Sequence, residues 1–216
     1  MQEFCIVANS PLLEKDLILK TIVGKKILAL DGAACVLHKY LIKPDIILGD
    51  FDSIDLQTKD YYGIKPITET YDEYLGKHGV LIVHAFDQNH TDLEKAIQYC
   101  DKESAKSITI IGATGGREDH HEALKIAFKE YYKPSRKIIA HSDYGSMCYA
   151  ENEIVRFNGK PGANCGFVLQ GFGTVISEGL QYQCQGHKHS ISNKMLGNIA
   201  SFCVNGGALL FLPLQI

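Results

Sequence analysis

The chain has 216 residues, 45% of them hydrophobic, and a formal net charge of -3, which suits one large domain or two small ones with a substantial core. No basic block appears, which argues against a nucleic-acid partner, and the apolar runs are too short for a membrane span. The start Met1-Gln2-Glu3 lacks the positive charge of a secretory signal. Seven cysteines without a C-x-x-C pair are typical of buried thiols in a reducing compartment, so we expect a cytoplasmic protein.

Residues 1–135 alternate between β-prone runs and stretches with helical spacing. The β-prone runs are continuously apolar, as expected for parallel strands buried on both faces. Residues 91–100 carry apolar side chains on one helical face and open with Thr91 and Glu94 in a capping-box pattern, and residues 123–131 have the same spacing. This alternation predicts a parallel-sheet, Rossmann-like α/β domain. Its expected strands are 4–8, 26–30, 45–48, 80–83 and 107–111.

After residue 135 the pattern changes to short β-prone runs separated by Gly, Asn and Asp. Turn residues at such regular spacing predict an antiparallel sandwich or barrel. We therefore expect two domains: an α/β domain over residues 1–135 and an antiparallel β-sandwich over residues 136–216. The expected strands of the second domain are 138–140, 147–149, 154–157, 166–169, 174–176, 200–204 and 208–212.

Two carboxylates two residues apart, Asp50 and Asp52, directly follow the apolar run 46–48. Two anions held close together repel each other, and a hard divalent cation such as Mg2+ removes that cost while accepting oxygen ligands. Because Mg2+ is usually shared with substrate phosphates, the turn Gly49–Ser53 indicates a nucleotide site. Taken alone, the turn is equally consistent with an acidic loop that caps a following helix.

Polar clusters follow each expected strand from the second to the fifth. The carboxyl ends of parallel strands share one edge of an open sheet, where ligands bind, so four clusters there predict a site. Asp92, in the first turn of its helix, is expected to be a third carboxylate facing Asp50 and Asp52. The alternative is that Asp92 only complements the helix dipole. The clusters are Asp31–Ala33, Gly49–Ser53, Asp87–Asp92 and Gly112–His121.

Residues 112–117 form a glycine-rich loop that runs into a helix. Glycines let backbone N–H groups approach phosphate oxygens, and a helix start favours anions. The loop matches neither the P-loop nor the dinucleotide-binding pattern, and Arg117 at its end would bind a phosphate through two parallel hydrogen bonds. Lys95 is a second candidate for a phosphate contact, although a lone helical lysine is more often a solvated surface charge.

Taken in order, these motifs resemble those of the thiamine pyrophosphokinase family. The resemblance implies that ATP donates its terminal diphosphate to the hydroxyethyl group of thiamine, giving AMP and thiamine diphosphate. It also implies Mg2+ as cofactor and a homodimer, with thiamine lying between the sheet edge of one subunit and the sandwich of the other. The matching motifs are Asp31–Ala33, Gly49–Ser53, Gln88–Lys95 and Gly115–His120, with later matches at 179–182 and 190–193.

The expected site residues fall into overlapping groups. We expect Asp50, Asp52 and Asp92 to hold Mg2+. The expected ATP-binding residues are Asp31, Gly32, Ser53, Gln88, Thr91, Lys95, Gly115, Gly116 and Arg117. The resemblance implies that thiamine binds to Gln88, Asp119, His120, Ser177, Tyr182, Ser192 and Asn193. The expected catalytic residues are Asp31, Asp50, Asp52, Asp92 and Asp119, of which Asp119 or Asp31 would orient or deprotonate the thiamine hydroxyl.

The chain departs from the family pattern at two places. Asn89 stands where many members have a further acid, and the chain has no tryptophan, whereas some members stack one on thiamine. Tyr182 occupies the matching place and offers a smaller stacking surface. Two other interpretations compete with the transferase: a phosphatase with an aspartate nucleophile, because Asp50–Ser53 loosely resembles D-x-D-x-T, and a binding module for thiamine or a nucleotide without turnover.

Overall fold

The computed structural model describes residues 2–11, 13–66 and 71–216, with only the backbone of residues 71 and 72. The chain divides into two compact units. The first comprises residues 1–127 and 135–137, and the second comprises residues 128–134 and 138–216. The assignment of separate catalytic and thiamine-binding roles to residues 1–135 and 136–216 stays a prediction.

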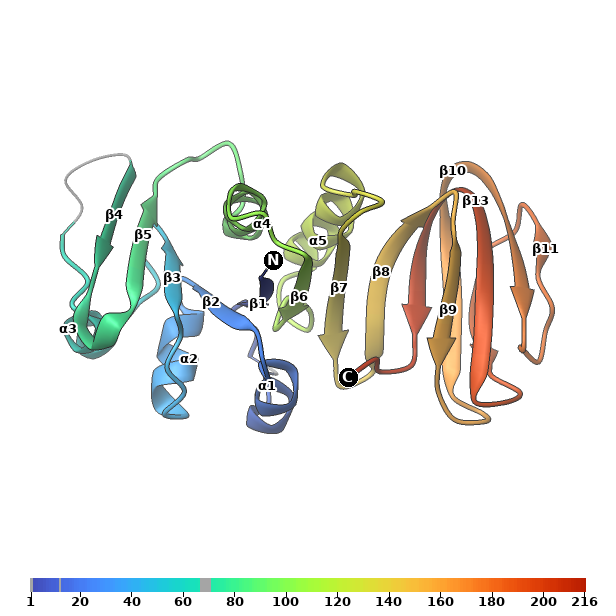
Figure 1. Cartoon of the computed structure of the whole chain (residues 1–216), viewed down its shortest axis with the longest axis horizontal. Helices are drawn as coiled ribbons and strands as arrows, with labels where there is room; N and C mark the ends of the chain where they lie inside the picture. The colour runs from blue at the N-terminus through green and yellow to red at the C-terminus, as the bar shows by residue number, and fades with distance from the viewer. Residues whose placement is uncertain (1, 12, 67–70) are drawn as a thin grey trace. The chain divides into compact units, whose positions relative to one another are not determined.

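The first unit is built on a sheet in the order β6-β1-β2-β3-β5-β4 (Figure 1). Strands β6, β1, β2, β3 and β5 run parallel, which confirms the predicted parallel sheet. Strand β4 pairs antiparallel with β5 and was not expected, because its sequence YDEYL lacks a continuous apolar run. The elements of this unit are β1 (Glu3–Val7), α1 (Lys15–Thr21), β2 (Lys26–Leu30), α2 (Ala33–Lys39), β3 (Ile46–Gly49), α3 (Leu56–Tyr62), β4 (Tyr71–Leu75), η1 (Lys77–Gly79), β5 (Leu81–Ala85), α4 (Asp92–Lys102), β6 (Ser107–Ile111) and α5 (Glu118–Glu130).

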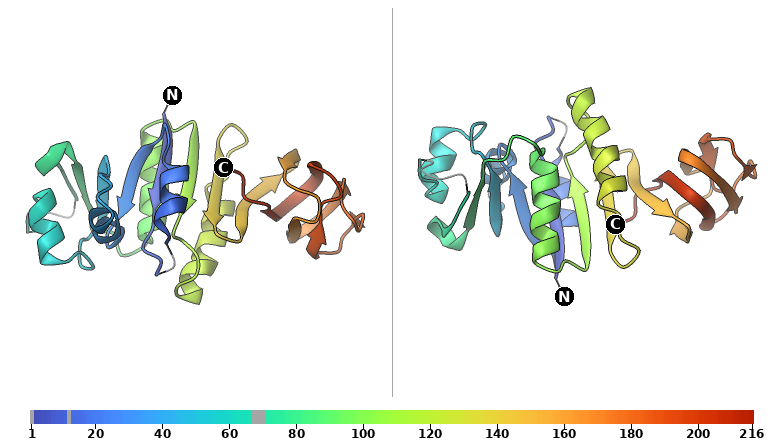
Figure 2. Two further views of the ribbon diagram at one scale, coloured as in Figure 1. Left: turned by 90° about the horizontal axis from the view of Figure 1, so that it is seen from below. Right: turned by 90° about the horizontal axis from the view of Figure 1, so that it is seen from above.

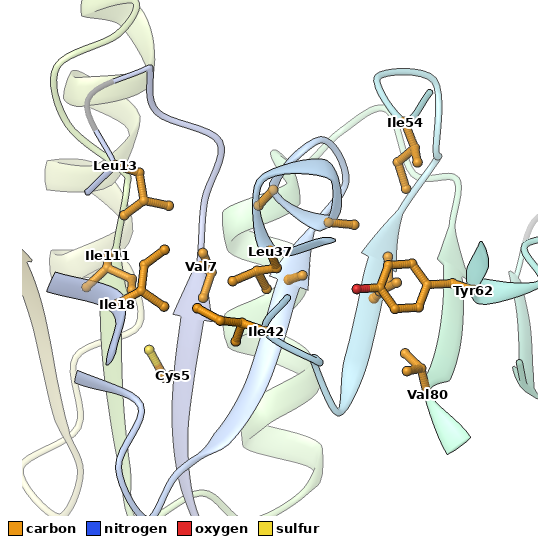
Figure 3. Close-up of a cluster of buried hydrophobic side chains, with 14 of the residues drawn as sticks. Cys5, Val7, Leu13, Ile18, Leu37, Ile42, Ile54, Tyr62, Val80 and Ile111 are labelled. Atoms are coloured by element: carbon orange, nitrogen blue, oxygen red, sulfur yellow. The ribbon is translucent and has the colours of Figure 1, made fainter. Parts of the chain in front are cut away.

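Helices cover both faces of this sheet. Buried side chains of α1, α2 and α3 form one core with the strands; those drawn in Figure 3 include Ile18, Leu37 and Tyr62. Helix α4 lies on the opposite face from α1, as the two views of Figure 2 show, and buries Ala96 and Ile97. The chain runs from β1 through β2 and β3 to β5, and then returns through α4 to β6 beside β1. The strand order therefore reverses between β1 and β6, the position at which open α/β sheets bind ligands.

Local signals set the helix starts. Helix α4 follows the capping box predicted for Thr91 and Glu94, and α3 is capped by Asp55, whose carboxylate accepts the N–H of Thr58 at 2.7 Å. Helix α5 begins at Glu118, earlier than the predicted 123–131. Its first residues, 118–120, are exposed and so carry no apolar periodicity that would reveal the helix start.

The second unit is antiparallel, as predicted. Residues 166–169 and 174–176, expected as two strands, lie within the single strand β10, and 200–204 and 208–212 both lie within β13. A Cβ on Gly173 would lie 2.6 Å from the carbonyl oxygen of Asn205, so this glycine marks a close approach of two paired strands rather than a turn. The elements are β7 (Lys137–Ser142), β8 (Gly145–Glu151), β9 (Ile154–Asn158), β10 (Asn164–Glu178), β11 (Gln185–Gly186), β12 (Ser190–Lys194) and β13 (Ile199–Leu212).

The two long strands pair with each other and with different partners along their length. Strand β13 pairs with β9 over residues 199–203 and with β8 over residues 207–212, and β10 pairs with β12 and then with β11. Buried side chains from all these stretches form one core, in which the rings of Phe157 and Phe167 both contact that of Phe202. Within the described residues, no helix is long and apolar enough to cross a membrane.

Candidate active site

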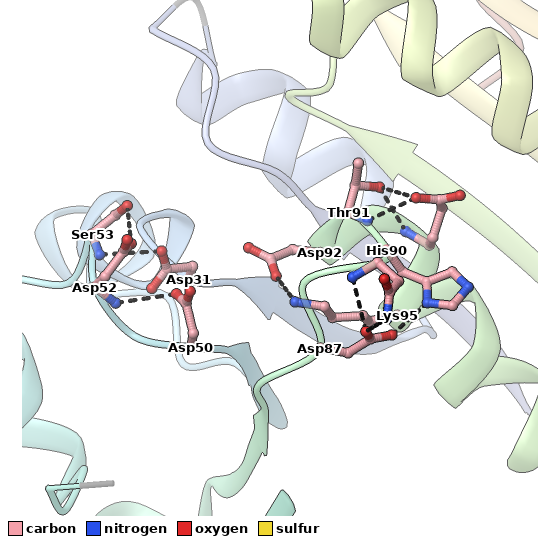
Figure 4. Close-up of polar contacts among 11 residues, drawn as sticks. Asp31, Asp50, Asp52, Ser53, Asp87, His90, Thr91, Asp92 and Lys95 are labelled. Carbon is pink, nitrogen blue, oxygen red and sulfur yellow. Dashed lines mark hydrogen bonds and ion pairs between the residues drawn. The ribbon is translucent and has the colours of Figure 1, made fainter. Parts of the chain in front are cut away.

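Three aspartates meet at the carboxyl ends of two neighbouring strands. Asp31 follows β2, and Asp50 and Asp52 follow β3 (Figure 4). One carboxylate oxygen from each lies within 4.8 Å of the other two. This is the arrangement that the strand-end rule predicts, because parallel neighbours place their following residues side by side.

The backbone between Gly49 and Ser53 turns sharply to bring these acids together. Phe51 has a left-handed φ of 64°, which costs free energy in a non-glycine residue, and its buried ring anchors the turn. Gly49 has a φ of 156°, and a Cβ there would lie 3.0 Å from the Cβ of Asp31. The backbone N–H of Asp52 donates to Asp50 Oδ1 at 3.3 Å, and Ser53 Oγ donates to Asp52 Oδ1 at 2.8 Å.

Asp31 is the most buried carboxylate of the three. Burial raises its pKa to about 6; hydrogen bonds from Ser53 oppose this rise, and the charges of Asp50 and Asp92 add to it. Its Oδ1 is buried and accepts no hydrogen bond from the described residues. A buried, unpartnered carboxylate oxygen beside two further carboxylates is a donor set that suits a hard divalent cation.

Asp92, predicted as a third metal ligand, forms an ion pair with a lysine in the structure. Its Oδ1 accepts a 3.0 Å ion pair from Lys95, whose side chain is only 9% exposed. The three grouped acids of the described residues are instead Asp31, Asp50 and Asp52. Asp92 lies close enough for its charge to raise the pKa of Asp31, and its assignment as a metal ligand stays a prediction.

The loop before α4 is ordered by Asp87. Its Oδ1 accepts the backbone N–H of Asn89 at 2.9 Å and the Asn89 side chain at 3.1 Å, while its Oδ2 pairs with the ring of His90. Thr91 bonds to Glu94 in the helix cap. The side chain of Gln88 is exposed and unbonded in the described residues, so it is the member of this loop that remains open to a ligand.

The glycine-rich loop lies beside the end of β1. Ser10 Oγ donates to the carbonyl oxygen of Thr114 at 2.6 Å, and a Cβ on Gly112 would lie 2.3 Å from the carbonyl oxygen of Ala8. Arg117 binds Asp119 with two hydrogen bonds, at 3.1 and 2.5 Å, which lowers the pKa of Asp119. The remaining predicted residues of the loop, Gly115, Gly116 and His120, are exposed.

Two residues beside the acids were not predicted. Asn9 follows β1, and a Cβ on Gly32 would lie 2.5 Å from Asn9 Nδ2; the strand-end rule would have found Asn9 had it been applied to the first strand. His84 on β5 packs against Phe51 with ring centroids 5.5 Å apart. It is 2% exposed, and neither ring nitrogen has a hydrogen-bond partner among the described residues. No sequence signal distinguishes this histidine.

The predicted thiamine residues of the second unit divide into two kinds. The side chain of Tyr182 is 64% exposed, and Ser192 is exposed with a left-handed φ of 63°. Ser177 and Asn193 are buried, at 3% and 1% exposure, and bond to the backbone of residues 182–184. Of these four side chains, those of Tyr182 and Ser192 are exposed to solvent.

Comparison with known proteins identifies relatives for the first unit. The family described as "Thiamin pyrophosphokinase, catalytic domain" matches residues 24–140. Thiamine pyrophosphokinase 1 of Arabidopsis thaliana is 32% identical over 122 residues, which are 52% of this chain and 39% of that protein. Thiamine pyrophosphokinase 1 of Oryza sativa subsp. japonica is 36% identical over 84 residues, which are 36% of this chain and 27% of that protein. The chain thus spans well under half the length of these relatives.

Solved structures extend the likeness to the whole chain. The thiamine pyrophosphokinase of Bacillus subtilis has a TM-score of 0.81 at 20% identity over 100% of both chains. Yeast thiamin pyrophosphokinase has a TM-score of 0.76 at 17% identity, over 97% of this chain and 85% of that chain. At these identities the likeness shows a common fold.

Proposed function

The chain belongs to the thiamin pyrophosphokinase family, and from that membership we propose that it transfers the terminal diphosphate of ATP to the hydroxyl group of thiamine. The products are thiamine diphosphate and AMP. The observation that carries the proposal is the meeting of Asp31, Asp50 and Asp52 at one sheet edge, because diphosphate transfer depends on charge neutralisation and positioning more than on covalent help from protein.

In this proposal the three grouped aspartates hold Mg2+, with Asp92 nearby as a further acid. The unpartnered Oδ1 of Asp31 supports this assignment. A bound Mg2+ would neutralise phosphate charge and fix the phosphate chain for in-line displacement. Ser53 then acts on the acids rather than on ATP, since its backbone N–H donates to Asp31 and its hydroxyl donates to Asp52.

The phosphate chain of ATP would lie along the sheet edge from these acids to the glycine-rich loop. Arg117 is exposed and so is accessible to a phosphate, and the backbone N–H groups at Gly115 and Gly116 are candidates for the same role. Lys95 is buried against Asp92, so it contributes positive charge without leaving the protein interior. Gln88 and Gly32 complete the proposed ATP contacts.

The proton of the thiamine hydroxyl needs an acceptor, and we assign it to Asp119. Asp31, the other candidate, is assigned to the cation in this proposal. A bound cation would keep its carboxylate ionised, so Asp31 would not accept the proton. In the free protein both oxygens of Asp119 accept hydrogen bonds from Arg117. An incoming phosphate that engages Arg117 would release Asp119 to orient the hydroxyl, with His120 beside it.

The second unit is proposed to bind thiamine and to form a homodimer. Tyr182 offers an exposed ring for stacking, and Ser192 offers a hydroxyl. The dimer is supported by apolar residues on the outer face of neighbouring strands: Ile154 and Ile176 are exposed and are both paired in register with Cys203. None of the seven cysteines forms a disulfide bond, which supports the proposed cytoplasmic location.

The experiment is a chromatographic assay of purified protein with ATP, MgCl2 and thiamine. We expect thiamine diphosphate from the wild type and none from Asp52→Asn, which should keep its circular dichroism spectrum. Ordinary turnover by Asp52→Asn at saturating Mg2+ would contradict the metal assignment. Phosphate release without thiamine would instead indicate a phosphatase, and thiamine binding without turnover would indicate a binding module.

A further inference from the structure

Asn193 holds the backbone of Tyr182 from one side. Its Oδ1 accepts the N–H of Tyr182 at 3.1 Å, and its Nδ2 donates to the carbonyl oxygen of Tyr182 at 2.6 Å. The side-chain amide therefore pairs both backbone polar groups of Tyr182, as a neighbouring strand would do. Two residues further along the chain, the N–H of Cys184 donates to Ser177 Oγ at 2.8 Å. We call Asn193 and Ser177 the clamp.

Asn193 has no hydrogen-bonding capacity left for a ligand. Asn193 Oδ1 also accepts the N–H of Lys194 at 2.9 Å, and Nδ2 also donates to Ser190 Oγ at 3.3 Å. A side-chain amide offers two donor hydrogens and two acceptor lone pairs, so these four hydrogen bonds use all of them. Both clamp side chains are buried, which leaves them no surface to present.

The segment that the clamp holds presents one aromatic ring outward. Leu180 and Met195 pair as an isolated bridge and are both buried, which anchors the start of the segment. The ring of Tyr182 follows at 64% exposure, with its hydroxyl accepting a hydrogen bond from Gln181 Nε2 at 3.3 Å. A rigidly held, exposed aromatic face suits stacking on a flat cationic ring, and holding it in advance lowers the entropy cost of binding.

We propose that Asn193 and Ser177 are positioning residues that do not touch thiamine and instead fix Tyr182 in the orientation that stacks on it. This assigns them a different role from the direct contact that the sequence resemblance implies. The inference rests on the proposed function, because that function supplies thiamine as the ligand. It predicts that the clamp acts only through Tyr182.

A double-mutant cycle separates positioning from contact. Asn193→Ala is expected to raise the KM for thiamine about tenfold, the size of one lost aromatic contact, and to leave the KM for ATP unchanged. The double variant Asn193→Ala/Tyr182→Ala is expected to match Tyr182→Ala alone, because the clamp has nothing left to position. Additive losses would overturn the inference, since they would show that Asn193 contacts thiamine independently.

Two further variants serve as a second test and as a control. Ser177→Ala removes a single acceptor, so it is expected to fold even if Asn193→Ala does not, and it should show the same non-additivity with Tyr182→Ala. Asn164→Ala is the matched control: Asn164 is exposed on β10, next to the residue paired with Asn193, and its side chain makes no hydrogen bond within the described part of the chain. It should leave both KM values unchanged.

A fluorescence readout separates failure of the clamp from failure of the proposed function. Because the chain has no tryptophan, Tyr182→Trp introduces a single indole at the segment. In that background Asn193→Ala should lower the indole anisotropy and weaken its quenching by thiamine. If the enzyme is active and Asn193→Ala leaves the indole anisotropy unchanged, Asn193 does not fix the orientation of residue 182 and the inference is wrong. If thiamine does not quench the indole and the protein makes no thiamine diphosphate, the proposed function is wrong. The anisotropy change caused by Asn193→Ala would still show whether Asn193 holds residue 182 in place.

Discussion

The backbone N–H of Ser53 donates to Oδ2 of Asp31 across 3.2 Å, which joins the residues that follow β3 to the residue that follows β2. This bond holds the acidic turn against Asp31 and opposes the rise in the pKa of that carboxyl caused by burial. The buried Oδ1 of Asp31 has no hydrogen-bond partner in the part of the chain that the structure describes. The proposed cation site therefore depends on Asp31 as much as on the acids of the turn.

Metal dependence should distinguish Asp31 from Asp92. Asp31→Asn removes a member of the grouped acids, so we expect the half-saturating Mg2+ concentration to rise and kcat to fall by about 100-fold or more. Asp92→Asn leaves the group intact and removes a salt bridge to Lys95, so its main effect should fall on the KM for ATP. Steady-state assays across a Mg2+ series test this, and a larger Mg2+ shift in Asp92→Asn would contradict the assignment.

Replacement of Arg117 even by lysine should weaken ATP binding. Its planar side chain makes two hydrogen bonds to Asp119 in the free protein, a geometry that lysine cannot reproduce. We expect Arg117→Lys to raise the KM for ATP by about tenfold or more, the loss of one charge-assisted hydrogen bond. Lys125→Gln, which breaks a pair with Glu122 on the same helix, serves as the control and should leave this KM unchanged.

His84 offers a test of stability rather than activity. Its buried ring nitrogens lack partners among the described residues, and an unsatisfied buried polar group costs about 1–3 kcal/mol. His84→Leu should therefore be neutral or raise the free energy of unfolding, measured by urea denaturation. A loss of more than about 1.5 kcal/mol would show that the imidazole is hydrogen-bonded in solution.

The pair Asp87–His90 should titrate as a unit. The hydrogen bond to Asp87 raises the pKa of His90, and the backbone N–H of Asn89 and then His90 lower the pKa of Asp87. The His90 contribution to stability is present below its unfolded pKa and is lost as the pH rises through its raised folded pKa. The Asp87 contribution is present above its unfolded pKa and is lost as the pH falls through its lowered folded pKa. The contact between Asp87 and His90 therefore stabilises the protein most at pH values between the lowered pKa of Asp87 and the raised pKa of His90.

NMR titration of the histidine ring signals measures this directly. The pKa of His90 should lie above its ordinary value in the wild type and fall toward that value in Asp87→Asn. An unchanged His90 pKa in this variant would show that another group causes the shift, and would contradict the contact between the two side chains.

Hydrophobic patterns and the position of polar residues after strands predicted much of the structure of the first unit. The continuous apolar runs identified the parallel strands, and the rule that their carboxyl ends share an edge brought Asp31, Asp50 and Asp52 together. The ion pair between Asp92 and Lys95 could not be predicted from the sequence. The partner that a buried lysine takes is decided by side-chain packing, which leaves no periodic pattern in the sequence.

The second unit was harder to predict because its structure depends on long-range register. Glycines that read as turns, such as Gly173, lie where β10 and β13 approach closely. The burial of the motif residue Asn193, which pairs with Cys165, could not be predicted from the motif, and its contact with thiamine stays a prediction of the resemblance. A motif identifies such a residue without revealing whether it faces the ligand or holds its neighbour.

Phosphorus NMR distinguishes the proposed transfer of diphosphate from ATP to thiamine from every other phosphoryl transfer. Spectra of the protein with ATP, Mg2+ and thiamine should show AMP and thiamine diphosphate appearing in equal amounts, as attack at the β-phosphorus requires. ADP or free phosphate in place of AMP would contradict one-step diphosphate transfer.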